Sequence, residues 1–154
     1  MKFQRFIALG DSFTEGMTDE IVAGNFRGWA DRVADVLTTQ TTDFTYVNLA
    51  IRGKLVKQVA EAQVPQALPF IIGKETLVSF HAGANDVLRP NYRPENVFPI
   101  YNEAVRTLAA TGATLMLLLC SSALVTPGKP PICGLKDLVL SIKMFEQWLL
   151  NLAQ

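Results

Sequence analysis

Cysteine is scarce in this sequence and net charge is absent, and each shortage argues against a class of protein. The 154 residues contain one histidine and two cysteines, and 14 basic residues balance 14 acidic ones, so the formal net charge is zero. The two cysteines, Cys120 and Cys133, are too few for a disulfide scaffold and fit no paired zinc-ligand pattern. A formal net charge of zero does not favour binding to nucleic acids or to an anionic membrane surface. We therefore expect no nucleic-acid partner.

Long apolar runs and low-complexity segments are missing as well. The longest apolar run surrounds residues 113–120 and falls short of the ~20 residues that a membrane-spanning helix needs. The apolar run near the N-terminus, 6–9, is too short for the core of a signal peptide. No internal repeat or linker divides the chain. These features predict a soluble, cytoplasmic protein that folds as a single domain over residues 1–154, with no membrane span.

Hydrophobic residues make up 49% of the chain, and their spacing predicts alternating strands and helices. Four short apolar segments predict β-strands, at 3–9, 44–50, 75–82 and 113–120. Helical spacing lies between them, at 28–37, 53–64 and 94–111. We expect Pro65 to end the second helix, and the third to begin at either Pro94 or Pro99 and to end at Gly112. This alternation predicts a three-layer α/β fold, in which a parallel sheet carries helices on both faces.

The segments that follow three of these strands carry residue types that ester hydrolysis needs. Ser12 follows the first strand in GDSFTEG, Gly53 follows the second, and Asn85 follows the third in GAND. Because ligands bind beyond the carboxyl ends of parallel strands, we expect these residues at one edge of the sheet. Ser12 could attack an acyl carbonyl, while the N–H groups of Ser12 and Gly53 and the side-chain amide of Asn85 hold the oxyanion. None of these steps requires a metal or an organic cofactor.

Each of these residues also has a purely structural interpretation. Ser12 could be a helix N-cap, Gly53 a turn glycine and Asn85 a turn or cap residue. The three blocks in this order favour the catalytic interpretation. We expect Asp11 and Asp86 to tie loops to backbone N–H groups rather than to act as acids or bases.

The blocks GDSFTEG, VNLAIRG and GAND together resemble the SGNH hydrolases, also called GDSL-type esterases and lipases, over roughly residues 4–119. The resemblance implies a flavodoxin-like sheet and a small-molecule ester as substrate. It also implies that Ser12 is the nucleophile and that Ser12, Gly53 and Asn85 form the oxyanion hole.

The fourth block of that family, Asp-x-x-His, is absent from the sequence. The only histidine is His81, which we expect inside the third strand, away from the edge that carries Ser12, as a partly buried residue rather than the base. Residues 136–152 predict an amphipathic helix that covers the core, although a helix with so few charges could also lie on a membrane. The helix resembles the one before the family's fifth strand. We therefore expect a family member that lacks this strand, so that 113–120 forms an exposed edge at which chains could self-associate.

Three functions remain for this sequence. The first is an ester hydrolase whose activity is impaired because the Asp-x-x-His block is absent. The second is a catalytically inactive remnant, or a binding module, with the same fold. The third, a flavodoxin-like nucleotide binder, is disfavoured because no G-x-G-x-x-G follows the first strand and no G-x-x-x-x-G-K-[ST] occurs.

Overall fold

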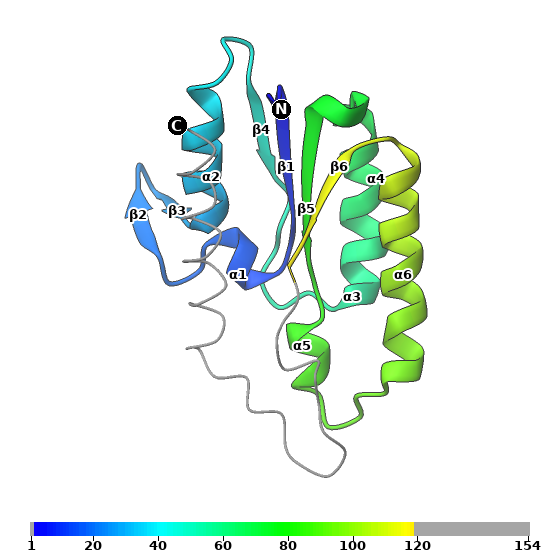
Figure 1. Ribbon diagram of the computed structural model, residues 1–154. Helices are drawn as coiled ribbons and strands as arrows, with labels where there is room; N and C mark the ends of the chain where they lie inside the picture. Colours follow the sequence, from blue (N-terminus) through cyan, green and yellow to red (C-terminus); the bar gives the residue numbers. More distant parts are fainter. Residues whose placement is uncertain (1, 119–154) are drawn as a thin grey trace. The chain divides into compact units, whose positions relative to one another are not determined.

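A computed structural model describes residues 2–118 and shows a parallel sheet at the centre of this part of the chain (Figure 1). The strands lie in the order β4-β1-β5-β6 and all pair in parallel. Their bounds are β1 Arg5–Gly10, β4 Thr45–Asn48, β5 Thr76–His81 and β6 Thr114–Leu117. Numbered among themselves, the strands run 2-1-3-4, which is the flavodoxin-like order. The predicted fold class and the four predicted strands are confirmed, each strand being shorter than its predicted segment.

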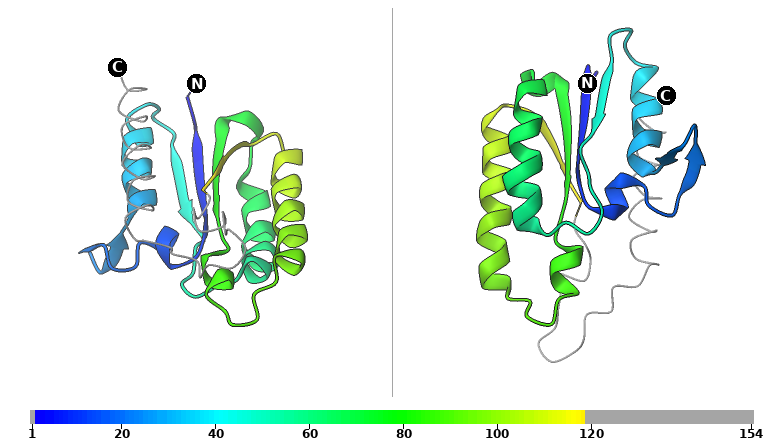
Figure 2. Two further views of the ribbon diagram at one scale, coloured as in Figure 1. Left: turned by 60° about the horizontal axis from the view of Figure 1, so that its bottom comes forward. Right: turned by 180° about the vertical axis from the view of Figure 1, so that it is seen from behind.

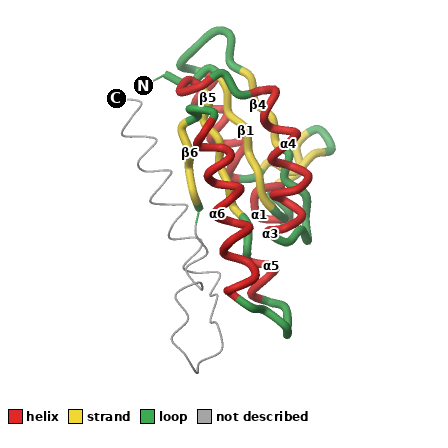
Figure 3. Tube along the Cα trace, turned by 90° about the vertical axis from the view of Figure 1, so that its right-hand side faces the viewer, coloured by secondary structure: helices red, strands yellow, loops and turns green. Residues whose placement is uncertain are grey.

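Helices cover both faces of this sheet. Helix α2, Trp29–Thr38, lies on one side, and the other side carries a longer helical layer (Figure 1). That layer consists of α3 Val56–Gln58, the π-helical turn η1 Val59–Gln63, α4 Val64–Ala67, the 3₁₀ turn η2 Leu68–Phe70 and α6 Pro94–Ala110. Helices α4 and α6 of this layer are seen in Figure 3. Shorter pieces are α1 Ser12–Glu15, the 3₁₀ turn η3 Gly73–Glu75 and α5 Ala84–Val87. No helix within residues 2–118 is long and apolar enough to span a membrane.

Alternate residues of the strands face the two helical layers, because side chains of a strand point to opposite sides. The core towards α4 and α6 consists of buried apolar side chains, namely Ile7, Leu9, Val59, Val64, Ala67, Val78, Phe80, Ala104 and Leu108. On the α2 side, the Phe6 ring packs against Trp29 at 6.4 Å and against Tyr46 at 5.3 Å between ring centroids. Both faces of the central strands β1 and β5 are therefore buried, as predicted for β5, whereas β6 is only half-buried and ends in the exposed Leu117.

Pro65 does not end the second helical segment, contrary to the sequence-based expectation. The helical path continues to Phe70 because a π turn precedes the proline: the Val64 N–H donates to Val59 O, five residues back. A new α-helical turn begins at Val64, and a proline is tolerated in a first turn, where its missing N–H has no helical partner to lose. The third helix begins at Pro94 and ends before Gly112, which has a positive φ of 77°.

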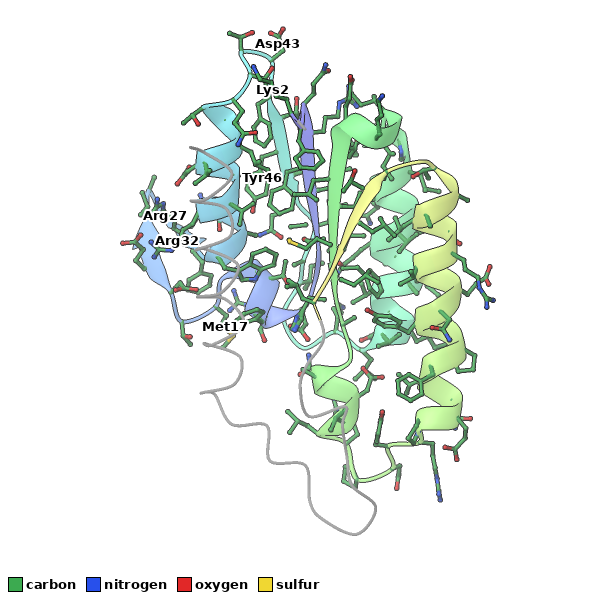
Figure 4. All side chains as sticks on the ribbon, viewed as in Figure 1. Lys2, Met17, Arg27, Arg32, Asp43 and Tyr46 are labelled. Atoms are coloured by element: carbon green, nitrogen blue, oxygen red, sulfur yellow. The ribbon has the colours of Figure 1, made fainter. Side chains whose placement is uncertain are left out.

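A two-stranded antiparallel hairpin after α1 was not predicted. Its strands are β2 Glu20–Val22 and β3 Asn25–Arg27. Arg27 binds Glu20 and Asp35, both at 2.6 Å, and Arg32 also reaches Glu20, at 3.3 Å. Figure 4 shows Arg27 and Arg32 close together at the hairpin. Strands of three residues have too little apolar alternation to be predicted from the sequence. Ion pairs between the hairpin and α2 contribute to holding this hairpin in place.

Residues 119–154 lie outside the described part of the chain. The predicted helix at 136–152, the last residues of the predicted strand 113–120 and the expected lack of a fifth strand therefore stay predictions. Within residues 2–118, β6 pairs with β5 along one side and is the last strand of the sheet.

Candidate active site

Three segments meet at the end of the sheet where the parallel strands finish. Helix α1 follows β1, the loop from β4 to α3 contains Gly53, and α5 follows β5. Figures 1 and 2 show these three segments at the same end of the sheet. The expectation that the three sequence blocks lie at one edge is confirmed.

The side chain of Asn85 connects the three blocks directly. Its Nδ2 donates to Oδ2 of Asp11 at 3.2 Å and to the carbonyl oxygen of Lys54 at 3.1 Å. Asp11 is the residue before Ser12, and Lys54 is the residue after Gly53. The amide of Asn85 therefore lies one residue from each of the other two predicted site positions.

Both hydrogens of the Asn85 amide point to acceptors of the protein in this arrangement. A primary amide nitrogen carries two hydrogens, and the two bonds to Asp11 and Lys54 use them. To donate to an oxyanion, Asn85 must exchange one of these bonds or share it. Both bonds, at 3.2 and 3.1 Å, lie at the long end of the usual N–H···O range.

Asp11, not Ser12, caps the short helix α1. The Oδ1 atom of Asp11 accepts the N–H of Phe13 at 3.1 Å, and Glu15 N–H donates to the Asp11 carbonyl at 2.9 Å. The N-cap interpretation of Ser12 is therefore wrong, because Ser12 is the first residue inside α1. Neither its hydroxyl nor its N–H makes a hydrogen bond within residues 2–118, which leaves both groups available to a ligand.

Gly53 lies in an exposed turn whose position is fixed by its neighbour. Its φ of 74° belongs to the left-handed region that glycine adopts without strain. The backbone N–H of Arg52 donates to Glu15 at 2.9 Å, and the guanidinium of Arg52 binds the same carboxylate at 2.9–3.2 Å. Because Glu15 is on α1, this ion pair holds the turn of Gly53 beside the helix that begins with Ser12.

Asp86 ties α5 to α3, as the sequence predicted. It is buried, and its Oδ2 accepts the N–H of Val56, the first residue of α3, at 2.9 Å. Burial raises the pKa of the Asp86 carboxyl, and the charge of Asp11 raises it further, whereas the N–H of Val56 opposes the shift. Asp11 was likewise expected to bind a backbone N–H group, and its bond to the N–H of Phe13 confirms this.

His81 lies closer to the candidate site than the sequence suggested. It is the last residue of β5 and pairs with Gly10, so the expectation that it lies away from this edge is wrong. The parallel register brings the end of β5 level with the end of β1. The imidazole is 2% exposed; its Nδ1 lies 3.7 Å from Oδ1 of Asp11, and its ring centroid lies 4.9 Å from that of Phe13. Nδ1 has no hydrogen-bond partner in the described part of the chain.

Gly10 brings β1, β5 and α1 into close contact, and Gly10→Ala tests this. A Cβ at Gly10 would lie 2.6 Å from the carbonyl oxygen of His81 and 2.6 Å from Oγ1 of Thr14. We expect Gly10→Ala to lower the free energy of unfolding by about 1–3 kcal/mol, measured by chemical denaturation, because overpacking of this size forces backbone shifts. Thr42→Ala is the control, since Thr42 is exposed in the loop before β4. An unchanged unfolding midpoint for Gly10→Ala would contradict the close contact.

Two buried or half-buried amides near the site were missed from the sequence. Asn48 donates to Thr14 O at 2.9 Å and accepts Ala50 N–H at 3.1 Å, so it joins the end of β4 to α1. Gln63 binds the backbone of Gly10 at 2.8 Å through both of its side-chain polar atoms. One signal was present for Gln63: it is a polar residue four positions after Val59 on an otherwise apolar helix face. Within residues 2–118 there is no group of three or more His, Cys, Asp or Glu residues that could hold a metal.

A comparison with protein families identifies this arrangement. The model of the GDSL-like Lipase/Acylhydrolase family matches residues 8–154. The chain belongs to the GDSL-like lipase/acylhydrolase family. The sequence-based resemblance is thereby confirmed, and the blocks around Ser12, Gly53 and Asn85 all lie within the matched residues.

Several solved structures have a similar fold. TesA is 24% identical, with a TM-score of 0.60 over 74% of this chain and 59% of its own. The psychrotrophic esterase EstA from Pseudoalteromonas sp. is 19% identical, with a TM-score of 0.57 over 74% of this chain and 58% of its own. A putative GDSL-like lipase from Parabacteroides merdae is 16% identical, with a TM-score of 0.63 over 97% of this chain and 76% of its own.

At these identities the solved structures show the fold alone. The match with TesA and with EstA spans less than two thirds of the length of either protein. The search among curated proteins gave no match.

Proposed function

We propose that this member of the GDSL-like family is a serine ester hydrolase that acts on a small-molecule ester. The Oγ atom of Ser12 attacks the acyl carbonyl carbon, the hydroxyl proton passes to a base, and the alcohol leaves with a proton as the acyl-enzyme forms. Water then releases the acid and restores Ser12. The N–H groups of Ser12 and Gly53 and the amide of Asn85 stabilise the oxyanion in both steps.

The observation that carries this proposal is the position of the Asn85 side chain. Its hydrogen bonds to Asp11 and Lys54 bring a side-chain donor between the neighbours of Ser12 and Gly53. Ser12 and Gly53 both have backbone N–H groups without hydrogen bonds in residues 2–118. A hydroxyl nucleophile and three N–H donors at the end of a parallel sheet supply two of the elements that acyl transfer needs, the nucleophile and the oxyanion hole.

A second candidate function, a binding module of the same fold without catalytic activity, is favoured by the state of His81. This imidazole is 2% exposed and packs against Asp11 and Phe13. Glu15 and Glu20 are not replacements for it, because Glu15 binds Arg52 and Glu20 binds Arg27. The hydrogen bond from Arg27 lowers the pKa of Glu20. Because neither His81 nor these two glutamates is free to accept the Ser12 proton, any hydrolysis by these 154 residues would be slow, at a rate set by the oxyanion hole without a strong base.

Replacement of the nucleophile separates the two functions. We expect Ser12→Ala to remove the protein-dependent hydrolysis of p-nitrophenyl acetate, measured by release of p-nitrophenolate, because no acyl-enzyme can then form. The control is Thr42→Ala, which removes a hydroxyl from an exposed position in the loop before β4. Equal rates for the wild type and Ser12→Ala would favour the binding module.

A further part of the proposal is self-association along the outer edge of β6. Among the described residues β6 pairs with β5 on one side only, and Leu117 is 42% exposed. Open edges of apolar strands pair with other chains.

A further inference from the structure

A single buried amide holds both backbone polar groups of Gly10, two residues before Ser12. Oε1 of Gln63 accepts the Gly10 N–H at 2.8 Å, and Nε2 of Gln63 donates to the Gly10 carbonyl at 2.8 Å. The Gln63 side chain is 2% exposed. Both bonds have good length and cross 53 residues of sequence, so they connect α3–α4 with the last residue of β1.

Gln63 acts where β4 separates from β1. The β1–β4 pairing ends at Ala8 and Asn48, after which the chain turns away towards Gly53. The N–H of Ile51, in the loop after β4, donates to the Gly10 carbonyl at 3.3 Å. The carbonyl of Gly10 therefore points towards the β4 side of β1. The side-chain amide of Gln63 therefore takes the place of a strand peptide at this position. Without it, a buried N–H would lose its partner, which is costly in a protein interior.

Gln63 is placed against Gly10 by the π turn to which it belongs. The Val64 N–H donates to Val59 O, five residues back, and Gln63 is the last residue of that turn. Val59, Gln63, Val64 and Ala67 are all buried on the sheet side of the helical segment. A polar residue can stay on such an apolar face because both of its polar atoms are hydrogen-bonded.

We infer that Gln63 is a positioning residue for the nucleophile: it fixes the end of β1 from which the turn to Ser12 begins. Asn85 holds Asp11 on one side of this turn, and Gln63 holds Gly10 on the other. Gly10 has no side chain of its own to anchor it. The inference rests on the proposed role of Ser12, since Gln63 touches the backbone and not the substrate.

Three variants test the inference in the full chain. Gln63→Met has nearly the same size but removes the donor and the strong acceptor. Gln63→Glu keeps the acceptor and regains a donor only when the carboxyl is protonated. Gln66→Met is the matched control, because Gln66 is exposed on the same helical segment.

Two measurements are made on each variant. The first is hydrogen exchange of the Gly10 amide by NMR, compared with the amides of Ile7 and Val78 as a check of the sheet. The second is the rate at which an alkyl fluorophosphonate modifies Ser12, a step in which Oγ bonds to phosphorus and fluoride and a proton leave. We expect Gln63→Met to accelerate exchange at Gly10 about tenfold and to slow modification about tenfold at saturating probe, with half-saturation unchanged.

The Gln63→Glu variant separates loss of the hydrogen bonds from loss of packing, because only the hydrogen bonds depend on pH. We expect its modification rate, divided by that of the wild type at the same pH, to rise as the pH is lowered from ~8 to ~5, because a protonated carboxyl again both donates and accepts. Gln66→Met should match the wild type throughout.

The outcomes separate this inference from the proposed function. If the Gly10 amide exchanges in Gln63→Met as in the wild type, or if exchange accelerates while Ser12 is modified at the wild-type rate, the inference is wrong. If the wild type gains no adduct on Ser12, the proposed function fails, and amide exchange still decides whether Gln63 fixes the turn.

Discussion

The 154-residue chain is expected to turn over p-nitrophenyl esters about 10⁶-fold more slowly than an esterase with a complete Ser-His pair. In subtilisin, loss of the triad histidine alone has an effect of about this size, and the remaining rate comes from binding and the oxyanion hole. The only histidine of this chain, His81, is buried against Asp11 and Phe13. Ser12 therefore has no exposed imidazole among these residues to accept its proton.

The measurement is steady-state hydrolysis over a range of protein concentrations, with His81→Gln as the companion variant. We expect both proteins to be equally slow. A rate of about 1 s⁻¹ or more, within the ordinary range of enzymes, would contradict this account. If His81→Gln then abolished that rate, His81 would be the base.

Asn85→Ala is expected to have the second largest effect. We expect the rate of Ser12 acylation to fall about 10²–10³-fold with little change in half-saturation, because an oxyanion donor acts mainly in the transition state. The variant also removes the hydrogen bonds to Asp11 and Lys54. Acylation by p-nitrophenyl acetate is followed by mass spectrometry of the intact protein.

The control for this variant is Asn91→Ala, which truncates an exposed asparagine six residues further along the chain. Thermal unfolding of both variants separates loss of the donor from loss of the fold. If Asn85→Ala reacts at the wild-type rate, Asn85 does not belong to the site.

The sheet and the three-block site could be predicted from the sequence because both depend on short-range patterns. Strands covered on two faces show little polar alternation, and the sequence segments of β5 and β6 have this pattern. A residue that follows a parallel strand must lie at its carboxyl edge, so the positions of Ser12, Gly53 and Asn85 followed from strand order alone.

The details of the site depend on contacts that no local pattern contains. His81 reaches the candidate site because β5 pairs in register with β1 up to Gly10, and this register is set by packing across the sheet. The contact between Gln63 and Gly10 depends on a π turn, and no residue pattern before Pro65 predicts such a turn. The hairpin near Arg27 likewise depends on ion pairs with Glu20 and Asp35.

Mapping the covalent adduct of an alkyl fluorophosphonate is the most direct test of the central claim that Ser12 is the nucleophile at this end of the sheet. The full chain is incubated with the probe, digested and sequenced by tandem mass spectrometry. This account predicts one phosphonyl group, located on Ser12 and absent from the Ser12→Ala variant. An adduct on another residue with Ser12 unmodified, or no adduct on Ser12 after prolonged incubation with excess probe, would contradict it.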